Sequence, residues 1–335
     1  MTGNRQVRLA ARPQGLPTEA DFDVTEAPAP EPADGQLVVQ VRFISLDPAM
    51  RGWMNDAPSY IPPVQIGEVM RAGAVGRVVA SRHPDYAEGD HVSGALGVQQ
   101  YAVSDGSGLI KVDPEAAALP VYLGALGMTG MTAYFGLLEI GRPEPGQTVV
   151  VSGAAGAVGS AVGQIAKLKG CRAIGIAGGE DKARVVVEEL GFDACIDYKA
   201  GEVRAALREH APDGVDVYFD NVGNPILDAV LTRIALGARV VICGAIAQYN
   251  ADTVEGPNNY LQLLVRRATM QGFVVFDYAD RYAEAAQEIA GWIADGRFTS
   301  QEDVVCGSVD AFPQILLQLF DGDNVGKLVL EVQHV

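Results

Sequence analysis

The sequence has no apolar run long enough to cross a bilayer. A transmembrane helix needs roughly 18 or more consecutive apolar residues, and no run of that length occurs in the chain. Its beginning, MTGNRQVRLAARPQGLP, lacks the apolar core of a secretory signal. We therefore expect a soluble cytoplasmic protein with no membrane partner.

Basic residues are also scarce. Lys and Arg number 25 against 42 Asp and Glu, which gives a formal net charge of −17. At long range, a chain this acidic repels the phosphate backbone of DNA and RNA. The charge balance therefore predicts that the protein does not bind nucleic acid.

Cysteine and histidine are few, with four of each in the chain. No two cysteines have CxxC spacing and the histidines lack metal-ligand spacing, so neither a disulfide framework nor a metal site is predicted. We expect the cysteines to be small, buried, apolar side chains. They are Cys171, Cys195, Cys243 and Cys306.

The chain has the length and the apolar content for two cores. Its 335 residues exceed the usual limit of about 250 to 300 residues for one core. From Leu37 to about Lys111, short β-rich runs alternate with Gly, Pro and Asp clusters, which is typical of an antiparallel barrel. From Thr148 onward, strand-like and helical runs alternate, which predicts parallel strands with helices on both faces.

These two patterns define the predicted domains and an α/β fold class. Residues 126–304 are predicted to form a doubly wound parallel sheet of the Rossmann type that binds a nucleotide. Residues 1–125 and 305–335 are predicted to form an antiparallel β-barrel domain. The C-terminal run GKLVLEV reads as a strand that returns to this first domain.

A glycine-rich turn joins the first predicted strand of the second half to its first helix. The segment VVVSGAAGAVGSAVG contains AxGxxG in place of the usual GxGxxG. Gly156 allows the backbone to approach a pyrophosphate, and Gly159 allows the helix to pack closely on the strand. The alternative is a glycine turn that binds no ligand, and the βαβ context favours the nucleotide site.

The residues about twenty positions further on distinguish NADPH from NADH. An NAD site places an acidic side chain at the end of the second strand, whereas residues 177–179 of this chain are Ala-Gly-Gly. The next acids, Glu180 and Asp181, are placed to cap the following helix. Lys182 suits a 2′-phosphate, so NADPH is predicted. An alternative role for Lys182 is that of a solvated charge on the helix.

Seven blocks of the sequence are together specific: NRQVRLAARPQG, DPAMRGWMNDAPSYIPPVQIGEVM, AAGAVGSAVGQIAKLKGC, YFDNVG, CGAIAQYN, QGFVV and DNVGKLVLEV. They resemble the zinc-independent branch of the medium-chain dehydrogenase/reductase superfamily. Within it the chain is similar to the NADPH-dependent alkenal/one oxidoreductases, which include prostaglandin reductases, plant double-bond reductases and bacterial curcumin reductase. The resemblance implies that the first domain, residues 1–125 and 305–335, is GroES-like and is the substrate and catalytic domain. It also implies a homodimer joined near GFVV.

The resemblance also implies which residues contact NADPH. The pyrophosphate would be held by Gly156, Ala157, Val158 and Gly159, and the 2′-phosphate would be flanked by Lys182 and Tyr198. The adenosine and nicotinamide parts would be lined by Asn221, Cys243, Gly244, Ala245, Ile246, Tyr249, Phe273, Val274, Val275 and Asn324. From the residues alone, an alternative role for Tyr198 is that of a packed aromatic, and for Asn221 that of a turn former.

The chemistry implied by the resemblance needs no metal. Zinc-dependent relatives carry Gly-His-Glu where this chain has Ile66-Gly67-Glu68, so the histidine ligand is missing. Hydride transfer to the β-carbon of an enone leaves a delocalised enolate, for which one hydrogen-bond donor suffices. The resemblance assigns this donor to Tyr249. It places Tyr60 on the substrate side, although a loop-packing role for Tyr60 remains an equal alternative.

The predicted activity is NADPH-dependent reduction of the C=C bond of α,β-unsaturated ketones and aldehydes. One alternative is an NADPH-dependent quinone oxidoreductase, because quinones are also conjugated acceptors. An alternative from a different class is a protein that binds NADPH without catalysis.

Overall fold

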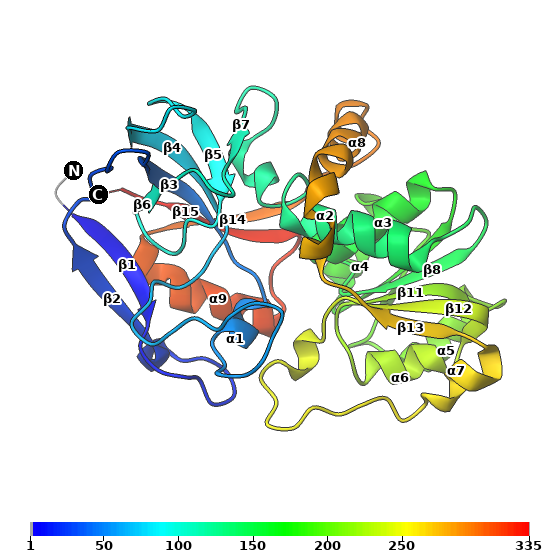
Figure 1. Ribbon diagram of the computed structural model, residues 1–335. Helices are drawn as coiled ribbons and strands as arrows, with labels where there is room; N and C mark the ends of the chain where they lie inside the picture. The colour runs from blue at the N-terminus through cyan, green and yellow to red at the C-terminus, as the bar shows by residue number, and fades with distance from the viewer. Residues whose placement is uncertain (1–2, 335) are drawn as a thin grey trace. The chain divides into compact units, whose positions relative to one another are not determined.

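The computed structural model describes residues 3–334, and the chain divides into two compact units. The first unit contains the N-terminal segment up to Leu123 and the C-terminal segment from Glu302. The second unit is Gly124–Gln301. In Figure 1 the red end of the chain accordingly runs beside blue strands from its beginning.

The first unit is built mainly from strands. They are β1 (Asn4–Leu9), β2 (Phe22–Ala27), β3 (Leu37–Ser45), β4 (Ala74–Ser81), β5 (His91–Gly94), β6 (Tyr101–Ser104), β7 (Ile110–Val112), β14 (Glu302–Gly307) and β15 (Lys327–Val332). The α-helices are α1 (Met50–Trp53) and α9 (Phe312–Asp321), and the 3-10 helices are η1 (Glu19–Asp21), η2 (Leu119–Tyr122) and η6 (Val309–Ala311).

The C-terminal strand completes the large sheet of the first unit, as predicted. The strand order is β14-β15-β3-β4-β5-β7, with β6 also paired to β3. Strand β15 runs antiparallel to β3, with Leu330 opposite Ile44. The parallel neighbour β14 and the separate β1–β2 pair were not predicted from the sequence. Strand β14 is an edge strand with only partly buried or exposed residues, so it lacks the apolar pattern of a core strand.

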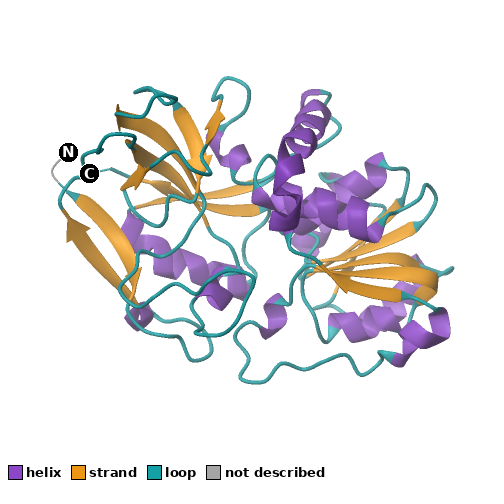
Figure 2. Cartoon of the chain, in the orientation of Figure 1, coloured by secondary structure: helices purple, strands orange, loops and turns teal. Residues whose placement is uncertain are grey.

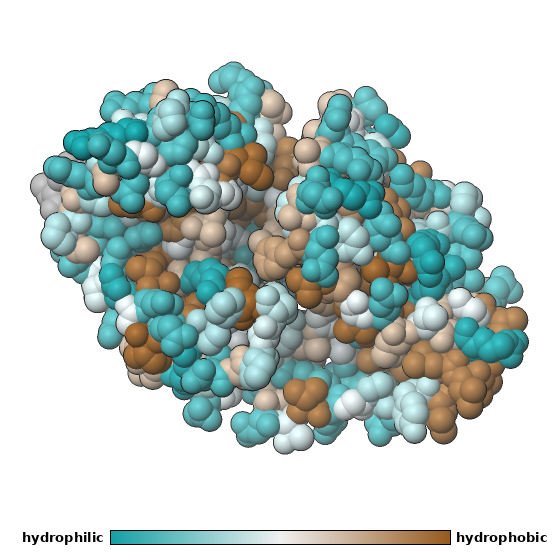
Figure 3. All heavy atoms as spheres, in the orientation of Figure 1, coloured by the Kyte–Doolittle hydropathy of each residue, from teal (hydrophilic) through white to brown (hydrophobic). Residues whose placement is uncertain are grey.

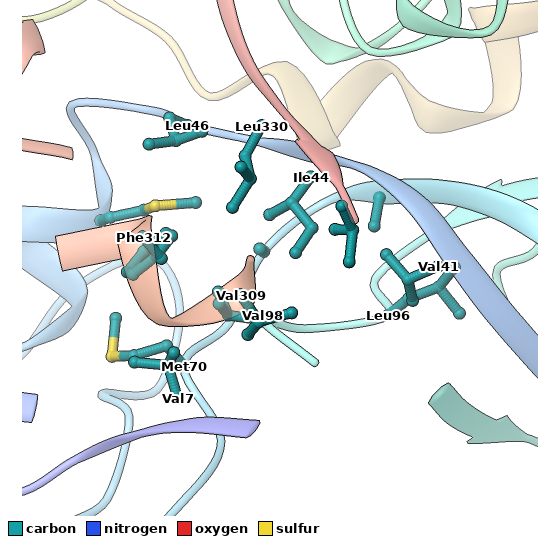
Figure 4. Packing of buried hydrophobic residues seen from close by; sticks show 14 of the residues in the cluster. Val7, Val41, Ile44, Leu46, Met70, Leu96, Val98, Val309, Phe312 and Leu330 are labelled. Carbon is teal, nitrogen blue, oxygen red and sulfur yellow. The ribbon is translucent and has the colours of Figure 1, made fainter. Parts of the chain in front are cut away.

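Side chains from both ends of the chain form the core of the first unit. Val41 and Ile44 of β3 pack with Leu330 of β15 and Phe312 of α9, and all four are fully buried (Figure 4). Burial of one such side chain contributes roughly 1.5 to 3 kcal/mol to folding. The C-terminal segment is therefore an integral part of this core.

The second unit alternates strands and helices. Its strands are β8 (Thr148–Ser152), β9 (Arg172–Ala177), β10 (Ala194–Asp197), β11 (Val215–Asp220), β12 (Ile234–Ile242) and β13 (Thr269–Gly272). Its α-helices are α2 (Met128–Phe135), α3 (Ala157–Leu168), α4 (Glu180–Glu188), α5 (Val203–His210), α6 (Ile226–Leu231), α7 (Leu261–Arg266) and α8 (Tyr282–Ala294). It also has the π-helix η3 (Gly136–Gly141) and the 3-10 helices η4 (Ile246–Gln248) and η5 (Val275–Arg281).

The sheet of the second unit is doubly wound. All its strands are parallel, and their order is β10-β9-β8-β11-β12-β13. The direction of winding reverses between β8 and β11, and helices cover both faces, with α3 and α4 on one and α5 and α6 on the other (Figure 2). The predicted Rossmann-type sheet is confirmed. None of the helices within residues 3–334 has the length and apolar character needed to span a membrane.

The cysteines depart in part from their predicted burial. Cys171 is buried, whereas Cys306 is exposed because it lies on edge strand β14. Cys195 and Cys243 are partly exposed as residues, yet burial of their thiols raises the pKa of each to about 12. The prediction of a buried apolar cysteine is therefore wrong for Cys306.

Candidate cofactor and substrate site

The cofactor residues predicted in the second unit all follow the carboxyl ends of strands. Because the strands are parallel, these ends lie along one edge of the sheet, which is where nucleotides bind in doubly wound folds. From β8 to β13, the segments that follow the six strands are 156–159, Lys182, Tyr198, Asn221, 243–249 and 273–275. The fold thus brings to one edge of the sheet residues that lie more than a hundred positions apart in the sequence.

The glycine turn after β8 has the geometry of a phosphate-binding loop. Gly153 adopts a left-handed φ of 63°, and Gly156 is the N-cap of α3. A Cβ at Gly159 would lie 2.2 Å from the carbonyl oxygen of Gly153 and 2.9 Å from Cα of Ala154. Glycine is therefore required where α3 packs on the turn. The start of this 12-residue helix directs main-chain N–H groups toward the sheet edge, where a pyrophosphate would fit.

A hydrogen-bond network links the ends of β8 and β11 at the reversal of winding. The Asn221 side-chain amide donates to the Ser152 carbonyl oxygen at 2.7 Å, and the Asn221 main-chain N–H donates to Ser152 Oγ at 3.0 Å. The Ser152 hydroxyl in turn donates to Asp220 Oδ1 at 3.0 Å. Asn221 therefore links two neighbouring strand ends.

Asp220 is the buried centre of this network. Its Oδ1 accepts hydrogen bonds from the Tyr218 hydroxyl at 2.8 Å and from the main-chain N–H groups of Val222 and Gly223 at 3.0 and 2.9 Å. Burial raises the pKa of this carboxyl, although the hydrogen bonds favour its charged form. Sequence reasoning did not single out Asp220 or Ser152. Their signal is a buried polar residue at the last position of a strand whose immediately preceding residues are buried and apolar.

The loop after β9 is shaped by Tyr198 and Asp197. A Cβ on Gly178 would lie 2.8 Å from the Tyr198 hydroxyl and from two of its ring carbons, so the ring lies against this glycine. Asp197 Oδ1 accepts the Gly179 N–H at 2.7 Å, and this bond lowers the pKa of Asp197. Tyr198 is nevertheless 46% exposed, and is thus not simply a packed aromatic.

The start of helix α4 differs from the sequence prediction. Gly179, with φ at 97°, is the N-cap residue, and no side chain caps the helix. Glu180 and Asp181 occupy the first turn itself, so the prediction that they cap this helix is wrong. Glycine holds the cap position because the turn needs a positive φ there. Lys182 is the third residue of α4 and is partly exposed.

The segment after β13 uses its side chains in packing. Phe273 lies against Gly136, where a Cβ would come within 2.4 Å of the ring, and its ring meets Phe219 edge-on at a centroid distance of 6.3 Å. Val275 is also buried. Sequence reasoning did not identify Gly136, whose missing side chain gives Phe273 its place.

Two predicted site residues belong to the first unit. Tyr60 lies on the loop after α1, is 56% exposed, and accepts a 3.5 Å hydrogen bond from the Trp53 indole N–H. Asn324 follows α9, and its side-chain amide donates to the Gly326 carbonyl oxygen at 3.0 Å. In the described part of the chain, no group of three or more His, Cys, Asp or Glu side chains is placed to hold a metal ion.

Comparisons with known proteins agree with this architecture. Residues 5–112 match the family described as the N-terminal domain of oxidoreductase, and residues 157–291 match the family described as zinc-binding dehydrogenase. The crystal structure of CurA from Vibrio vulnificus in complex with NADPH superposes with a TM-score of 0.94 at 46% identity, covering 99% of this chain and all of that one. Escherichia coli quinone oxidoreductase complexed with NADPH has a TM-score of 0.77 at 20% identity, which shows a shared fold alone.

Curated relatives match over nearly their whole length. The NADPH-dependent curcumin reductase of Escherichia coli is 43% identical, covering 98% of this chain and 97% of that protein. The 2-alkenal reductase of Nicotiana tabacum is 38% identical, with 99% and 98% covered. Mouse prostaglandin reductase 1 is 36% identical, with 95% and 96% covered. This chain therefore belongs to the medium-chain dehydrogenase/reductase superfamily and, within it, to the NADP-dependent oxidoreductase family of the curcumin, 2-alkenal and prostaglandin reductases.

Proposed function

We propose that the protein is an NADPH-dependent reductase of the C=C bond in α,β-unsaturated ketones and aldehydes. The observation that carries this proposal is the alignment of six predicted cofactor segments along one sheet edge, with Tyr249 among them. The close relatives named as curcumin and 2-alkenal reductases support the same reaction.

The residues at the sheet edge fit NADPH. The bare backbone at Gly156 and Gly159 leaves room for a pyrophosphate at the start of α3, because side chains there would collide with or crowd Gly153. Lys182 and Tyr198 would flank the 2′-phosphate beside a strand end that has no carboxylate at residues 177–179. NADPH supplies the hydride when it is bound.

Tyr249 would stabilise the negative charge that develops on the substrate. Hydride arrival at the β-carbon moves charge onto the carbonyl oxygen, and the phenol would donate a hydrogen bond to that oxygen. A proton from water or from a relayed hydroxyl would then reach the α-carbon and give the saturated product. One well-placed donor of this kind is worth about 3 to 4 kcal/mol in the transition state. Tyr60, which is exposed on the first unit, is proposed as a second hydroxyl on the substrate side. The cofactor lining proposed for Asn221, Phe273 and Asn324 rests on their matches to the family motifs.

The reaction is tested by following NADPH oxidation with three acceptor classes. We expect turnover with trans-2-alkenals and with dienones of the curcumin type, and the product should be the saturated carbonyl compound. Turnover of benzoquinones alone would replace this proposal with quinone reduction. Tight NADPH binding without turnover of any acceptor would instead indicate a protein that binds the nucleotide without catalysis.

We also propose that a second copy of this chain pairs with the β13 edge of the second unit. Within residues 3–334, β13 pairs on one side only, with β12. Helix α7, which precedes β13 and contacts β12, exposes Leu261, Leu264 and Val265 at 58%, 75% and 58%. Hydrophobic surface gathers over α7 in Figure 3. An open strand edge beside an apolar patch suits a self-complementary dimer.

Replacing Leu264 with Asp should disrupt this dimer, because the charge would be buried against the partner. Analytical ultracentrifugation should give twice the mass of one chain for the wild type and a shift toward the single-chain mass for Leu264→Asp. The matched control is Ile110→Asp, since Ile110 is 61% exposed in the first unit. A wild-type monomer, or an equal effect of both substitutions, would contradict the proposed interface.

A further inference from the structure

The segment 243–249 uses almost all of its main-chain N–H groups within the backbone. Six of these seven groups donate to main-chain oxygens: Cys243 and Gly244 to Asp220, Ile246 to Asn221, Ala247 to Val222, Gln248 to Ala245, and Tyr249 to Ile246. The Ala245 N–H is different, because it donates to the phenol oxygen of Tyr249 at 3.3 Å. The phenol therefore completes the hydrogen bonding of its own loop.

Gly244 makes this contact possible. A Cβ at Gly244 would lie 2.8 Å from the Tyr249 hydroxyl oxygen and at an ordinary distance of 3.5 Å from the Asn221 carbonyl oxygen. Gly244 does not have the positive φ that would exclude alanine. A methyl group would thus collide with the far end of one side chain and leave the backbone acceptable. Substitution at Gly244 should displace the phenol while preserving the fold.

We infer that Gly244 and the Ala245 N–H form a seat that positions the Tyr249 phenol for catalysis. This inference rests on the proposed function. The seat fixes the oxygen before the substrate arrives, which preorganises the donor for the developing charge. The amide that donates to the phenol oxygen also polarises the hydroxyl group, because hydrogen bonds in a chain strengthen one another. Gly244 is therefore a positioning residue that acts through Tyr249.

Gly244→Ala should reduce kcat for enone reduction by about 10- to 100-fold, a large part of the effect of losing an oxyanion donor. Because residues 243–249 are also predicted to line the cofactor, the Kd for NADPH is measured by nucleotide fluorescence and kcat is taken at saturating NADPH, so that a change in cofactor affinity does not affect the comparison. The matched control is Gly256→Ala. It adds the same methyl group on the next stretch of the chain, where a Cβ meets no atom within 4 Å, and it should behave as wild type.

Combining Gly244→Ala with Tyr249→Phe tests whether the two residues act together. Once the phenol oxygen is gone, the added methyl should cause no further loss of kcat and no further drop in thermal midpoint. The thermal midpoints of the wild type, the two single variants and the double variant form a double-mutant cycle that does not depend on activity. Additive losses of kcat at saturating NADPH, or additive drops in thermal midpoint, would overturn the inference.

The inference and the proposed function fail in different ways. Full activity of Gly244→Ala with an impaired Tyr249→Phe would overturn the positioning role of Gly244. The proposed reaction and the role of Tyr249 would then stand. Full activity of both variants would overturn the role of Tyr249 itself. If Gly244→Ala lowers the midpoint strongly and does so equally with and without the phenol, the methyl acts on the loop, and the seat is again overturned.

Discussion

Tyr249→Phe should lower kcat for enone reduction by about 100- to 1,000-fold, because the variant would lose the proposed hydrogen-bond donor to the developing enolate oxygen. NADPH affinity should change little, since the proposed phosphate contacts come from the turn after β8 and from the loops after β9 and β10. The enone KM should also change less than kcat, because an interaction made mainly in the transition state affects the chemical step.

The measurement is single-turnover NADPH oxidation with a saturating enone, accompanied by a fluorescence titration of NADPH. Tyr260→Phe is a suitable control, because Tyr260 is an exposed tyrosine of the same unit and is 58% accessible. The midpoint of thermal unfolding should fall slightly in Tyr249→Phe alone, because the Ala245 N–H loses its acceptor. Unaltered turnover in Tyr249→Phe would remove the phenol from the mechanism.

Lys182→Ala should reduce the preference for NADPH over NADH by about 10- to 100-fold. A hydrogen bond between an ammonium group and a phosphate contributes about 1.5 to 3 kcal/mol, and each 1.4 kcal/mol is one decade in affinity. Lys182 lies in the first turn of α4, where a cation opposes the helix dipole. A bound phosphate would be favoured there by both the dipole and the lysine.

The ratio of NADPH to NADH affinity is measured by fluorescence titration at one fixed ionic strength. Arg184→Ala is the matched control: it removes a cation two residues further along α4, where Arg184 pairs with Asp181 at 3.0 Å. NADH affinity should be the same in Lys182→Ala and the wild type. If both cofactors weaken equally, or if Arg184→Ala has the same effect, Lys182 does not read the 2′-phosphate.

Both sheets could be predicted where their strands carry a strong apolar pattern. The alternation of strands and helices after Thr148 indicated the doubly wound sheet, because buried parallel strands need continuous apolar runs. The run KLVLEV likewise indicated the C-terminal strand. Strands β2 and β14 were missed, since their residues are largely exposed or only partly buried. Strand β1 was missed because its sequence NRQVRL has polar residues at four of its six positions, although most of the strand is buried. Cys306 departs from the expected burial because it lies on the edge strand β14.

The sequence by itself determined the parts of the site that are local motifs. The glycine turn after β8 is one, because backbone freedom and helix-start geometry depend on neighbouring residues. The absence of an acid at residues 177–179 is another, since it is a property of one strand end.

Only the tertiary structure decided which distant groups meet. Asp220 accepts a hydrogen bond from Ser152, which lies 68 positions earlier in the chain, and Gly178 lies against the ring of Tyr198, which follows the next strand. The phenol of Tyr249 lies against Gly244 in a loop whose first residues are hydrogen-bonded to the end of β11 and to the two residues that follow it. Such contacts follow from strand order and from the close packing of protein interiors. In a close-packed interior, the missing side chain of a glycine leaves the space that an aromatic side chain occupies. The spacing of these residues along the chain does not predict the contacts.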